Sequence, residues 1–158
     1  MAVLIRQSRQ DDSVAIRQCI VELQDFERGI DPRLRPGESM ADAYWDHLQQ
    51  RCAAANGVVY VAIQDEALVG FVAVLAEEPF EGFDDPPGTY GLVTDIVVLG
   101  SHRGQGIGRK LLEQAEAFVR AAGAHELRIG VMSRNQNARR LYLNAGFLPH
   151  LEILAKNV

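Results

Sequence analysis

Hydrophobic residues recur along the chain in two kinds of pattern. Some segments are short apolar runs that are typical of strands, and others repeat every three or four residues, as in helices. The run 3–7 predicts a short strand, and a helix follows in which Asp11 or Asp12 is the cap and Gly29 marks the end. The apolar face of this helix repeats every three or four positions: Ile16, Cys19, Ile20, Leu23 and Phe26. The same spacing predicts a second helix from Ala41 up to Asn56, after a loop that contains two prolines.

The middle of the chain combines strand-forming runs with loop signals. Runs 58–64 and 68–76 are separated by a short turn, so they predict an antiparallel hairpin. The segment 77–91 carries prolines, glycines and five acidic residues without a base, and it predicts a loop. The nearly continuous apolar run 92–99 predicts a strand that leads straight into a glycine-rich turn at 102–108.

The remaining pattern completes the prediction of the fold. A strongly amphipathic helix starts at Ile107 and ends at Gly123. A strand at 125–132, a helix at 135–145 and a last strand or pair of strands from Phe147 onward follow. Because this order is neither a clean alternation of strands and helices nor all-β, we predict an α/β fold (an α+β mixed sheet). Helices cover both faces of the sheet, and one domain spans 1–158.

Composition narrows the classes of function. The chain has 158 residues, of which 47% are hydrophobic and 23% charged, as in an ordinary globular domain. Its net charge of −5 disfavours binding to nucleic acid and to anionic membranes, and it favours cationic partners. No apolar run approaches the ~20 residues that span a bilayer, and the first residues lack the apolar region of a leader, so a cytoplasmic protein is expected. Two cysteines without metal-ligand spacing predict neither a zinc site nor a disulfide framework.

The glycine-rich turn is the strongest candidate for chemistry. Glycine costs up to about 1 kcal/mol relative to alanine in a helix, so Gly104, Gly106 and Gly108 at a helix start require a reason. One reason is a tight turn without any ligand. The other is the close approach of a pyrophosphate to backbone N–H groups, with Arg103 and Arg109 adding positive charge. The spacing of the glycines matches neither the dinucleotide fingerprint nor the Walker A loop.

Two motifs resemble the GCN5-related N-acetyltransferase (GNAT) superfamily. Its acetyl-CoA motif, Gln/Arg-x-x-Gly-x-Gly/Ala, is matched in full by 103–108. A second family pattern, Asn-x-x-Ala-x-x-Leu/Phe-Tyr-x-x-x-Gly-Phe, is matched without a gap by 135–147. The order of the predicted elements is also similar to that family over nearly the whole chain. The resemblance implies a mostly antiparallel sheet with one splayed parallel strand pair, and acetyl-CoA as the co-substrate without a metal.

The resemblance also implies site residues. Backbone groups of Ile96, Val97 and Val98 receive pantetheine, and the Val98 N–H polarises the thioester carbonyl. Tyr142 stands at the position of the family's general acid, although helical spacing alone favours a core tyrosine. Asn135 is expected to cap its helix and to contact CoA. The implied cofactor-binding set is Ile96, Val97, Val98, Arg103, Gly104, Gln105, Gly106, Ile107, Gly108, Arg109, Asn135, Ala138 and Tyr142.

The sequence departs from its relatives at the residue expected to remove the proton from the amine. An amine nucleophile must lose a proton before it attacks, yet Thr94 stands where several family members carry a glutamate, and a hydroxyl cannot serve as that base. Asp95 is the nearest carboxylate, but strand alternation can turn it away from the substrate. Glu27 and Asp95 are candidate contacts for a cationic acceptor, and a solvated acidic face is the alternative interpretation.

The resemblance therefore predicts an N-acetyltransferase that acts by direct attack of a primary amine from a small, cationic acceptor. Residues 22–27 and the acidic loop look most like the polyamine and diamine acetyltransferases. Two alternatives stay open: a catalytically weak acyl-CoA-binding sensor, and acetylation of a protein or peptide amine. Family analogy adds a homodimer as an expectation, while neither nucleic acid nor a membrane is expected as a partner.

Overall fold

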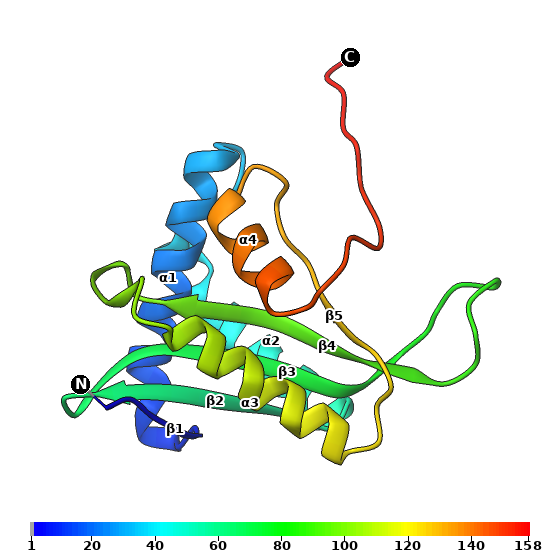
Figure 1. Ribbon diagram of the computed structural model, residues 1–158. Helices are drawn as coiled ribbons and strands as arrows, with labels where there is room; N and C mark the ends of the chain where they lie inside the picture. Colours follow the sequence, from blue (N-terminus) through cyan, green and yellow to red (C-terminus); the bar gives the residue numbers. More distant parts are fainter. Residues whose placement is uncertain (1) are drawn as a thin grey trace.

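A five-stranded mixed sheet forms the centre of the computed structural model, which describes residues 2–158 (Figure 1). The strands lie in the order β1-β2-β3-β4-β5. All neighbours are antiparallel except the parallel pair β4 and β5. Their bounds are β1 Leu4–Gln7, β2 Gly57–Gln64, β3 Ala67–Pro79, β4 Thr89–Val98 and β5 Leu127–Ile129.

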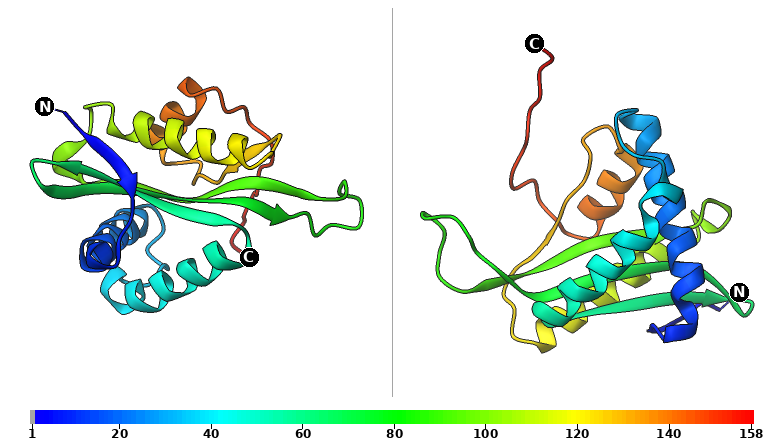
Figure 2. Two further views of the ribbon diagram at one scale, coloured as in Figure 1. Left: turned by 90° about the horizontal axis from the view of Figure 1, so that it is seen from below. Right: turned by 180° about the vertical axis from the view of Figure 1, so that it is seen from behind.

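Four α-helices cover the two faces of this sheet, as Figure 2 shows in edge-on view. Helices α1 (Ser13–Ile30) and α2 (Ala41–Ala54) lie on one face, while α3 (Ile107–Ala121) and α4 (Gln136–Asn144) lie on the other. Each of α1 and α2 is preceded by a short 3₁₀ turn, η1 (Gln10–Asp12) and η2 (Gly37–Ser39), respectively. A third, η3 (Gly100–His102), leads into the glycine-rich turn before α3. The predicted fold class, an α/β mixed sheet with helices on both faces, is confirmed.

The core consists of two apolar layers that share the sheet. Leu111 and Ala115 of α3 are fully buried against one face, and Ile16 of α1 is fully buried against the other. Strand β3 is buried from Val69 to Ala76 because it lies in the middle of the sheet with helices on both sides. The central strands therefore have a rigid frame on which the neighbouring loops are mounted.

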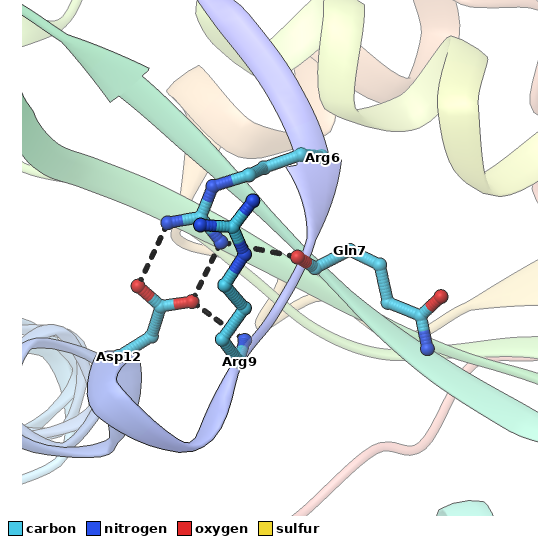
Figure 3. A network of polar contacts seen from close by, with 4 residues as sticks. All are labelled: Arg6, Gln7, Arg9 and Asp12. Carbon is cyan, nitrogen blue, oxygen red and sulfur yellow. Dashed lines mark hydrogen bonds and ion pairs between the residues drawn. The ribbon is translucent and has the colours of Figure 1, made fainter.

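The start of α1 differs from the predicted side-chain cap. Neither Asp11 nor Asp12 makes a cap hydrogen bond to α1. Instead, the Asp12 carboxylate accepts two bonds from the Arg6 guanidinium (2.7 and 3.0 Å) and one from the Arg9 N–H (2.7 Å), as Figure 3 shows. The hydrogen bonds from Arg6 are the main reason why the pKa of Asp12 lies below its ordinary value. Asp12 thus ties β1 to α1 rather than capping the helix.

A β-bulge in β4 separates β4 from β5. The register pairs Ala73 with Asp95 but Val74 with Val93, so Thr94 is one extra residue in β4, and its hydroxyl donates to the Ala73 carbonyl (3.3 Å). A bulge bends a strand and increases its local twist. Pairing of β4 with β5 stops at Val93, immediately before the bulge. The splayed parallel pair implied by the family resemblance is therefore present, and the bulge explains where the splay begins.

The C-terminal prediction is wrong in this structure. No strand follows Phe147 among the described residues, and the segment 147–158 is extended and leaves the body of the chain (Figure 1). Strand β5 is also shorter than the predicted 125–132, because β4 bends away from it after Val93. A strand requires a neighbour for its backbone hydrogen bonds, and the end of α4 directs the last residues away from the sheet edge.

Candidate functional site

A cavity of about 600 Å³ opens where β4 and β5 separate. Its walls come from α1 and α2 on one side, from the turn before α3 and from α4 on the other, and from β4 and the residues after β5 between them. Its size falls within the range of ~300–1,000 Å³ that is typical of small-molecule sites. Fifteen residues were predicted as site residues, and all except Gln105 line this cavity.

Backbone groups of β4 face the gap. The Leu99 N–H donates to the Val69 carbonyl (2.9 Å), and the register pairs Val98 with Gly70. Leu99 is thus in a hydrogen-bonded pair with β3, and such pairs alternate with non-hydrogen-bonded pairs along an antiparallel ladder. Val98 and Ile96 therefore fall in non-hydrogen-bonded pairs, and their N–H groups point away from β3 and toward the gap. The Val98 carbonyl, on the same side, accepts a bond from the Arg103 Nε (3.0 Å). A free N–H at Val98 is therefore available beside the cavity.

The turn before α3 has the conformation that its glycines allow. Gly104 and Gly106 have φ values of 75° and 78°, in the left-handed region that disfavours residues with a Cβ. Gly106 is the N-cap of α3, and no side chain accepts a hydrogen bond there. The first N–H groups of α3 are thus left for another acceptor, at the positive end of the helix dipole. This arrangement suits an anion such as a pyrophosphate.

Helix α1 holds this turn from the opposite side of the cavity mouth. The Glu22 carboxylate accepts a hydrogen bond from the Gly100 N–H (2.7 Å) and lies 3.8 Å from the Arg103 guanidinium. Arg103 also stacks over the Phe26 ring, with its Cζ atom 5.3 Å from the ring centroid. Arg103 therefore positions the turn as well as carrying charge.

Gln105 and Arg109 have partners within the chain. The Gln105 side chain accepts a hydrogen bond from the buried Gln64 of β2 (3.3 Å), and it points away from the cavity. Arg109 pairs with Glu113 one turn further along α3 (3.0 Å), and both side chains are exposed. Any contact of Gln105 with a ligand in the cavity would have to come from its backbone.

Helix α4 contributes Asn135, Ala138 and Tyr142 to the cavity. The Asn135 Oδ1 accepts a hydrogen bond from the Ala138 N–H (3.3 Å), so the predicted helix cap is confirmed. Tyr142 is buried and packs edge to face against Phe147. Burial, followed by the charges of Glu27 and Asp95, raises the pKa of Tyr142 to about 12. The phenol therefore keeps its proton throughout the neutral range.

An acidic cluster closes the other end of the cavity. Asp95 of β4 accepts a short hydrogen bond from the Tyr44 hydroxyl of α2 (2.6 Å). Burial raises the pKa of Asp95, and burial together with the Asp95 charge raises the pKa of Glu27. Both carboxyls line the cavity, so strand alternation does not remove Asp95 from it. This end combines negative charge with partial burial, a combination that is common at functional sites.

Three residues of this arrangement were not predicted as site residues. Tyr44 and Gln64 lie in runs that predict a helix and a strand, and Glu22 lies in the segment 22–27 that resembles the polyamine and diamine acetyltransferases. Each acts through a contact between segments far apart in the chain: Tyr44 with Asp95, Glu22 with Gly100, and Gln64 with Gln105. Spacing within one helix or strand carries no signal for such contacts.

The remaining sequence expectations concern metal ligands, membrane-spanning helices and the two cysteines. Across residues 2–158, no group of three or more His, Cys, Asp and Glu side chains is arranged to hold a metal ion. None of the helices in that range has the length and apolar character needed to cross a bilayer. Both cysteines are free thiols, and burial raises their pKa values to about 12 for Cys19 and about 11 for Cys52. The cytoplasmic location stays a prediction.

Comparison with known proteins agrees with this geometry. The family model described as the acetyltransferase (GNAT) family matches residues 20–147. The chain is 29% identical over 89 residues to the L-methionine sulfoximine/L-methionine sulfone acetyltransferase of Salmonella typhimurium. That match covers 56% of this chain, and the chain spans about half (49%) of the length of this curated relative.

Solved structures with the same fold cover nearly the whole chain. A GCN5-related N-acetyltransferase from Ralstonia eutropha superposes with a TM-score of 0.74 at 22% identity, over 99% of each chain. The aminoglycoside N-acetyltransferase AAC(6')-Iy, bound to the bisubstrate analogue CoA-S-monomethyl-acetylneamine, gives a TM-score of 0.71 at 15% identity, over 100% of this chain and 99% of that one. The family model covers most of the chain, and the predicted resemblance is confirmed: this chain belongs to the acetyltransferase (GNAT) family.

Proposed function

We propose that this protein is an acetyl-CoA-dependent N-acetyltransferase that transfers an acetyl group to a primary amine of a small, cationic acceptor. One observation carries the proposal: a single cavity joins the free Val98 N–H and the glycine turn at one end with the acidic cluster of Glu27 and Asp95 at the other. The first end suits an acyl thioester with a pyrophosphate, and the second suits an ammonium group. Tyr142 of α4 lines the same cavity, close enough to Glu27 and Asp95 for their charges to help raise its pKa.

The residues present fit acetyl-CoA. The uncapped N-terminus of α3, with Gly104 and Gly106, would bind the pyrophosphate. The gap-facing backbone groups of Ile96 and Val98 would hold the pantetheine arm as a partner strand would. Asn135, Ala138 and Arg109 line the same cavity and complete the proposed binding set. When bound, acetyl-CoA supplies an activated acyl group on a good leaving group.

Val98 supplies the electrostatic part of the proposed mechanism. Its N–H donates to the thioester oxygen as negative charge develops there when the amine nitrogen attacks the acyl carbon. The new N–C bond forms and the C–S bond breaks, with the electron pair of that bond leaving on sulfur. The nitrogen then loses its second proton, which balances the proton taken up by the sulfur, so that an amide and the thiol of CoA result. A preorganised donor of this kind contributes roughly 3–4 kcal/mol to the stabilisation of a transition state.

Tyr142 is the proposed proton donor to the departing sulfur. Its pKa of about 12 keeps the hydroxyl protonated at neutral pH. Because a thiol has a pKa of ~8.5, complete transfer of the proton from such a phenol is unfavourable, so Tyr142 acts by a strong hydrogen bond and partial transfer as the C–S bond breaks.

Glu27 and Asp95 are the proposed contacts for the acceptor. An ammonium group of pKa ~10 is attracted by two nearby carboxyls and must release one proton before it attacks. The raised pKa values of both carboxyls make either of them a better proton acceptor than an ordinary carboxylate, and Asp95 is held by Tyr44. This acidic pair takes the place of the glutamate that several relatives carry at the position of Thr94.

Two of the similar proteins support a small acceptor rather than a protein. One acts on L-methionine sulfoximine or L-methionine sulfone, and another is bound to an acetylneamine analogue. Polyamines and diamines fit the acidic end of this cavity by charge. A weak acyl-CoA-binding sensor is the second candidate, because Thr94 cannot serve as a base and its hydroxyl is occupied by the Ala73 carbonyl.

An acetyl-transfer assay tests the proposal. Release of CoA from acetyl-CoA is measured with a linear diamine, an aminoglycoside, an amino acid and a peptide amine as acceptors. We expect the highest kcat/KM for the diamine or the aminoglycoside. Glu27→Gln should raise the KM for these acceptors. Glu38→Gln is the matched control and should not, because it removes an exposed carboxylate outside the cavity. Binding of acetyl-CoA without turnover for any acceptor would favour the sensor.

A further inference from the structure

Gln64 is a polar residue within an apolar layer of the core. It is the last residue of β2, and strand alternation places its side chain with those of Val58 and Ala62, on the face of the sheet that α3 covers. Only 6% of Gln64 is exposed, and among residues 2–158 no other polar or charged residue has so little exposed surface. An apolar side chain of similar length, such as that of methionine, would fill this position without a polar atom to satisfy.

One half of the Gln64 amide has a partner and the other half has none. Its Nε2 donates to the side-chain carbonyl of Gln105, in the turn before α3 (3.3 Å). Its Oε1 is buried and accepts no hydrogen bond from the part of the chain that the structure describes. A buried carbonyl without a donor has lost its hydration and gained nothing in return, so it lowers the stability of the fold. Such exceptions to good packing are expected where function requires them.

Gln105 is the point at which the middle of this turn can be held. At one end the turn is fixed by the contacts of Arg103, and at the other end by Ile107, which is buried in the core. Between these two residues Gln105 has the only side chain, because both of its neighbours are glycines with positive φ. Glycine has more conformational freedom than any other residue. The hydrogen bond from Gln64 therefore fixes the part of the turn that its own sequence leaves most free.

The frame that carries Gln64 is rigid. Asp65 and Glu66, with φ values of 50° and 64°, form a two-residue hairpin loop, and Gln64 pairs with Ala67 at the start of β3. This hairpin and the turn before α3 lie at the same end of the molecule (Figure 1). The contact thus joins a flexible turn to a strand in the interior of the sheet.

We propose that Gln64 is a positioning residue for acetyl-CoA. By holding the Gln105 side chain, it keeps the turn before α3 in the conformation that receives the pyrophosphate. A turn that is already ordered loses less conformational freedom when the ligand binds, so the contact favours binding although Gln64 touches no ligand. The inference rests on the proposed acetyl-CoA site and is independent of the proposed transfer step.

The test separates this positioning role from a purely structural one. Gln64→Met keeps the length of the side chain and removes both polar atoms, while Gln105→Ala removes the partner at an exposed position. Gln50→Met is the matched control, because it makes the same chemical change at an exposed position of α2 outside the cavity. Calorimetry gives the Kd for acetyl-CoA, and thermal unfolding without ligand gives the midpoint, for these variants and for the double variant Gln64→Met/Gln105→Ala.

We expect Gln64→Met to weaken acetyl-CoA binding by roughly 2- to 12-fold, the range that corresponds to one hydrogen bond. Its thermal midpoint of unfolding should stay the same or rise, because the unpaired carbonyl has left the core. Gln105→Ala should weaken binding to a similar extent and the double variant no further, because both changes remove the same contact. Gln50→Met should change neither the Kd nor the midpoint.

Unchanged binding of acetyl-CoA in Gln64→Met would overturn the proposal. Weaker binding together with a lower midpoint would also overturn it, because Gln64 would then affect the turn only by holding the fold together. Additive losses in the double variant would show that the two residues act separately, which contradicts the proposed contact. Wild-type protein that binds acetyl-CoA but acetylates no amine would reject the proposed transfer and leave this test intact, whereas wild-type protein that does not bind acetyl-CoA would overturn both.

Discussion

Removal of the Tyr142 hydroxyl should reduce the rate of acetyl transfer without affecting the fold. Tyr142→Phe keeps the ring that packs against Phe147 and deletes only the oxygen. Within the described residues that hydroxyl has no hydrogen-bond partner, so its loss leaves no buried group unpaired. The thermal midpoint of unfolding should therefore change little.

The magnitude follows from the two acidities. The phenol has a pKa of about 12, while a thiol has ~8.5, and each unit corresponds to ~1.4 kcal/mol, so complete proton transfer is uphill by roughly 5 kcal/mol. Tyr142 thus contributes a hydrogen bond to a charged sulfur, a contact worth about 1.5–3 kcal/mol. The loss corresponds to a decrease in kcat of roughly 10- to 150-fold at unchanged affinity for acetyl-CoA.

Rapid-mixing measurements under conditions in which the chemical step limits turnover would check this result. Tyr60→Phe is the matched control, because Tyr60 packs edge to face against Phe118 outside the cavity. The wild-type rate should also show no decrease from phenol ionisation below pH 10, given the raised pKa of Tyr142. Full kcat in Tyr142→Phe would refute the assignment of this residue as the proton donor.

Three further substitutions test other parts of the account. Asp95→Asn should raise the thermal midpoint of unfolding at neutral pH and lower kcat/KM for cationic acceptors. Burial raises the pKa of Asp95, so its charged form destabilises the fold at a pH above that pKa, and the substitution removes this charge. Calorimetry should therefore find a gain in stability at pH 7 that is smaller at pH 4. Asp12→Asn should reduce the free energy of unfolding by about 1–3 kcal/mol at neutral pH, because it removes the ion pair with Arg6. The effect should be smaller toward low pH, because the pKa of Asp12 is lowered in the folded state and the wild-type protein also loses the ion pair as the carboxylate takes up a proton. Urea unfolding of both proteins across pH 3–7 measures the difference and its pH dependence. Gly106→Ala should lower the free energy of unfolding by about 1–2 kcal/mol and weaken acetyl-CoA binding, because φ is 78° at this position. As the control, Gly29→Ala in α1 should leave stability unchanged or slightly higher, because a Cβ there meets open space. Equal effects of the two changes on acetyl-CoA binding would contradict this role of Gly106.

Much of the fold could be predicted because its elements are defined locally. The period of apolar residues identified α3, and the glycines at 104–108 identified the turn before it, since both signals lie within one short segment. The boundaries of β5 depended instead on where β4 bends, which in turn depends on the extra residue Thr94 and its register against β3. No pattern within β5 itself carries that information.

The site was predicted to the extent that motifs cover it. The two family motifs led to the turn before α3 and to Asn135 and Tyr142, all of which line one cavity. The contact of Tyr44 with Asp95 was not predicted, because the two residues come from different elements and meet only after α2 packs on the sheet. The strand expected after Phe147 was wrong, because the end of α4 directs the last residues away from the sheet, where they have no strand to pair with.

The most direct test of the central claim is the mass of the product. Purified protein is incubated with acetyl-CoA and a linear diamine, and mass spectrometry follows the diamine while calorimetry follows binding of acetyl-CoA to the same sample. The account predicts a diamine in which one acetyl group replaces one amine hydrogen, at a rate that falls in Tyr142→Phe. Binding of acetyl-CoA with no acetylated product from the diamine or from any other amine acceptor would contradict it.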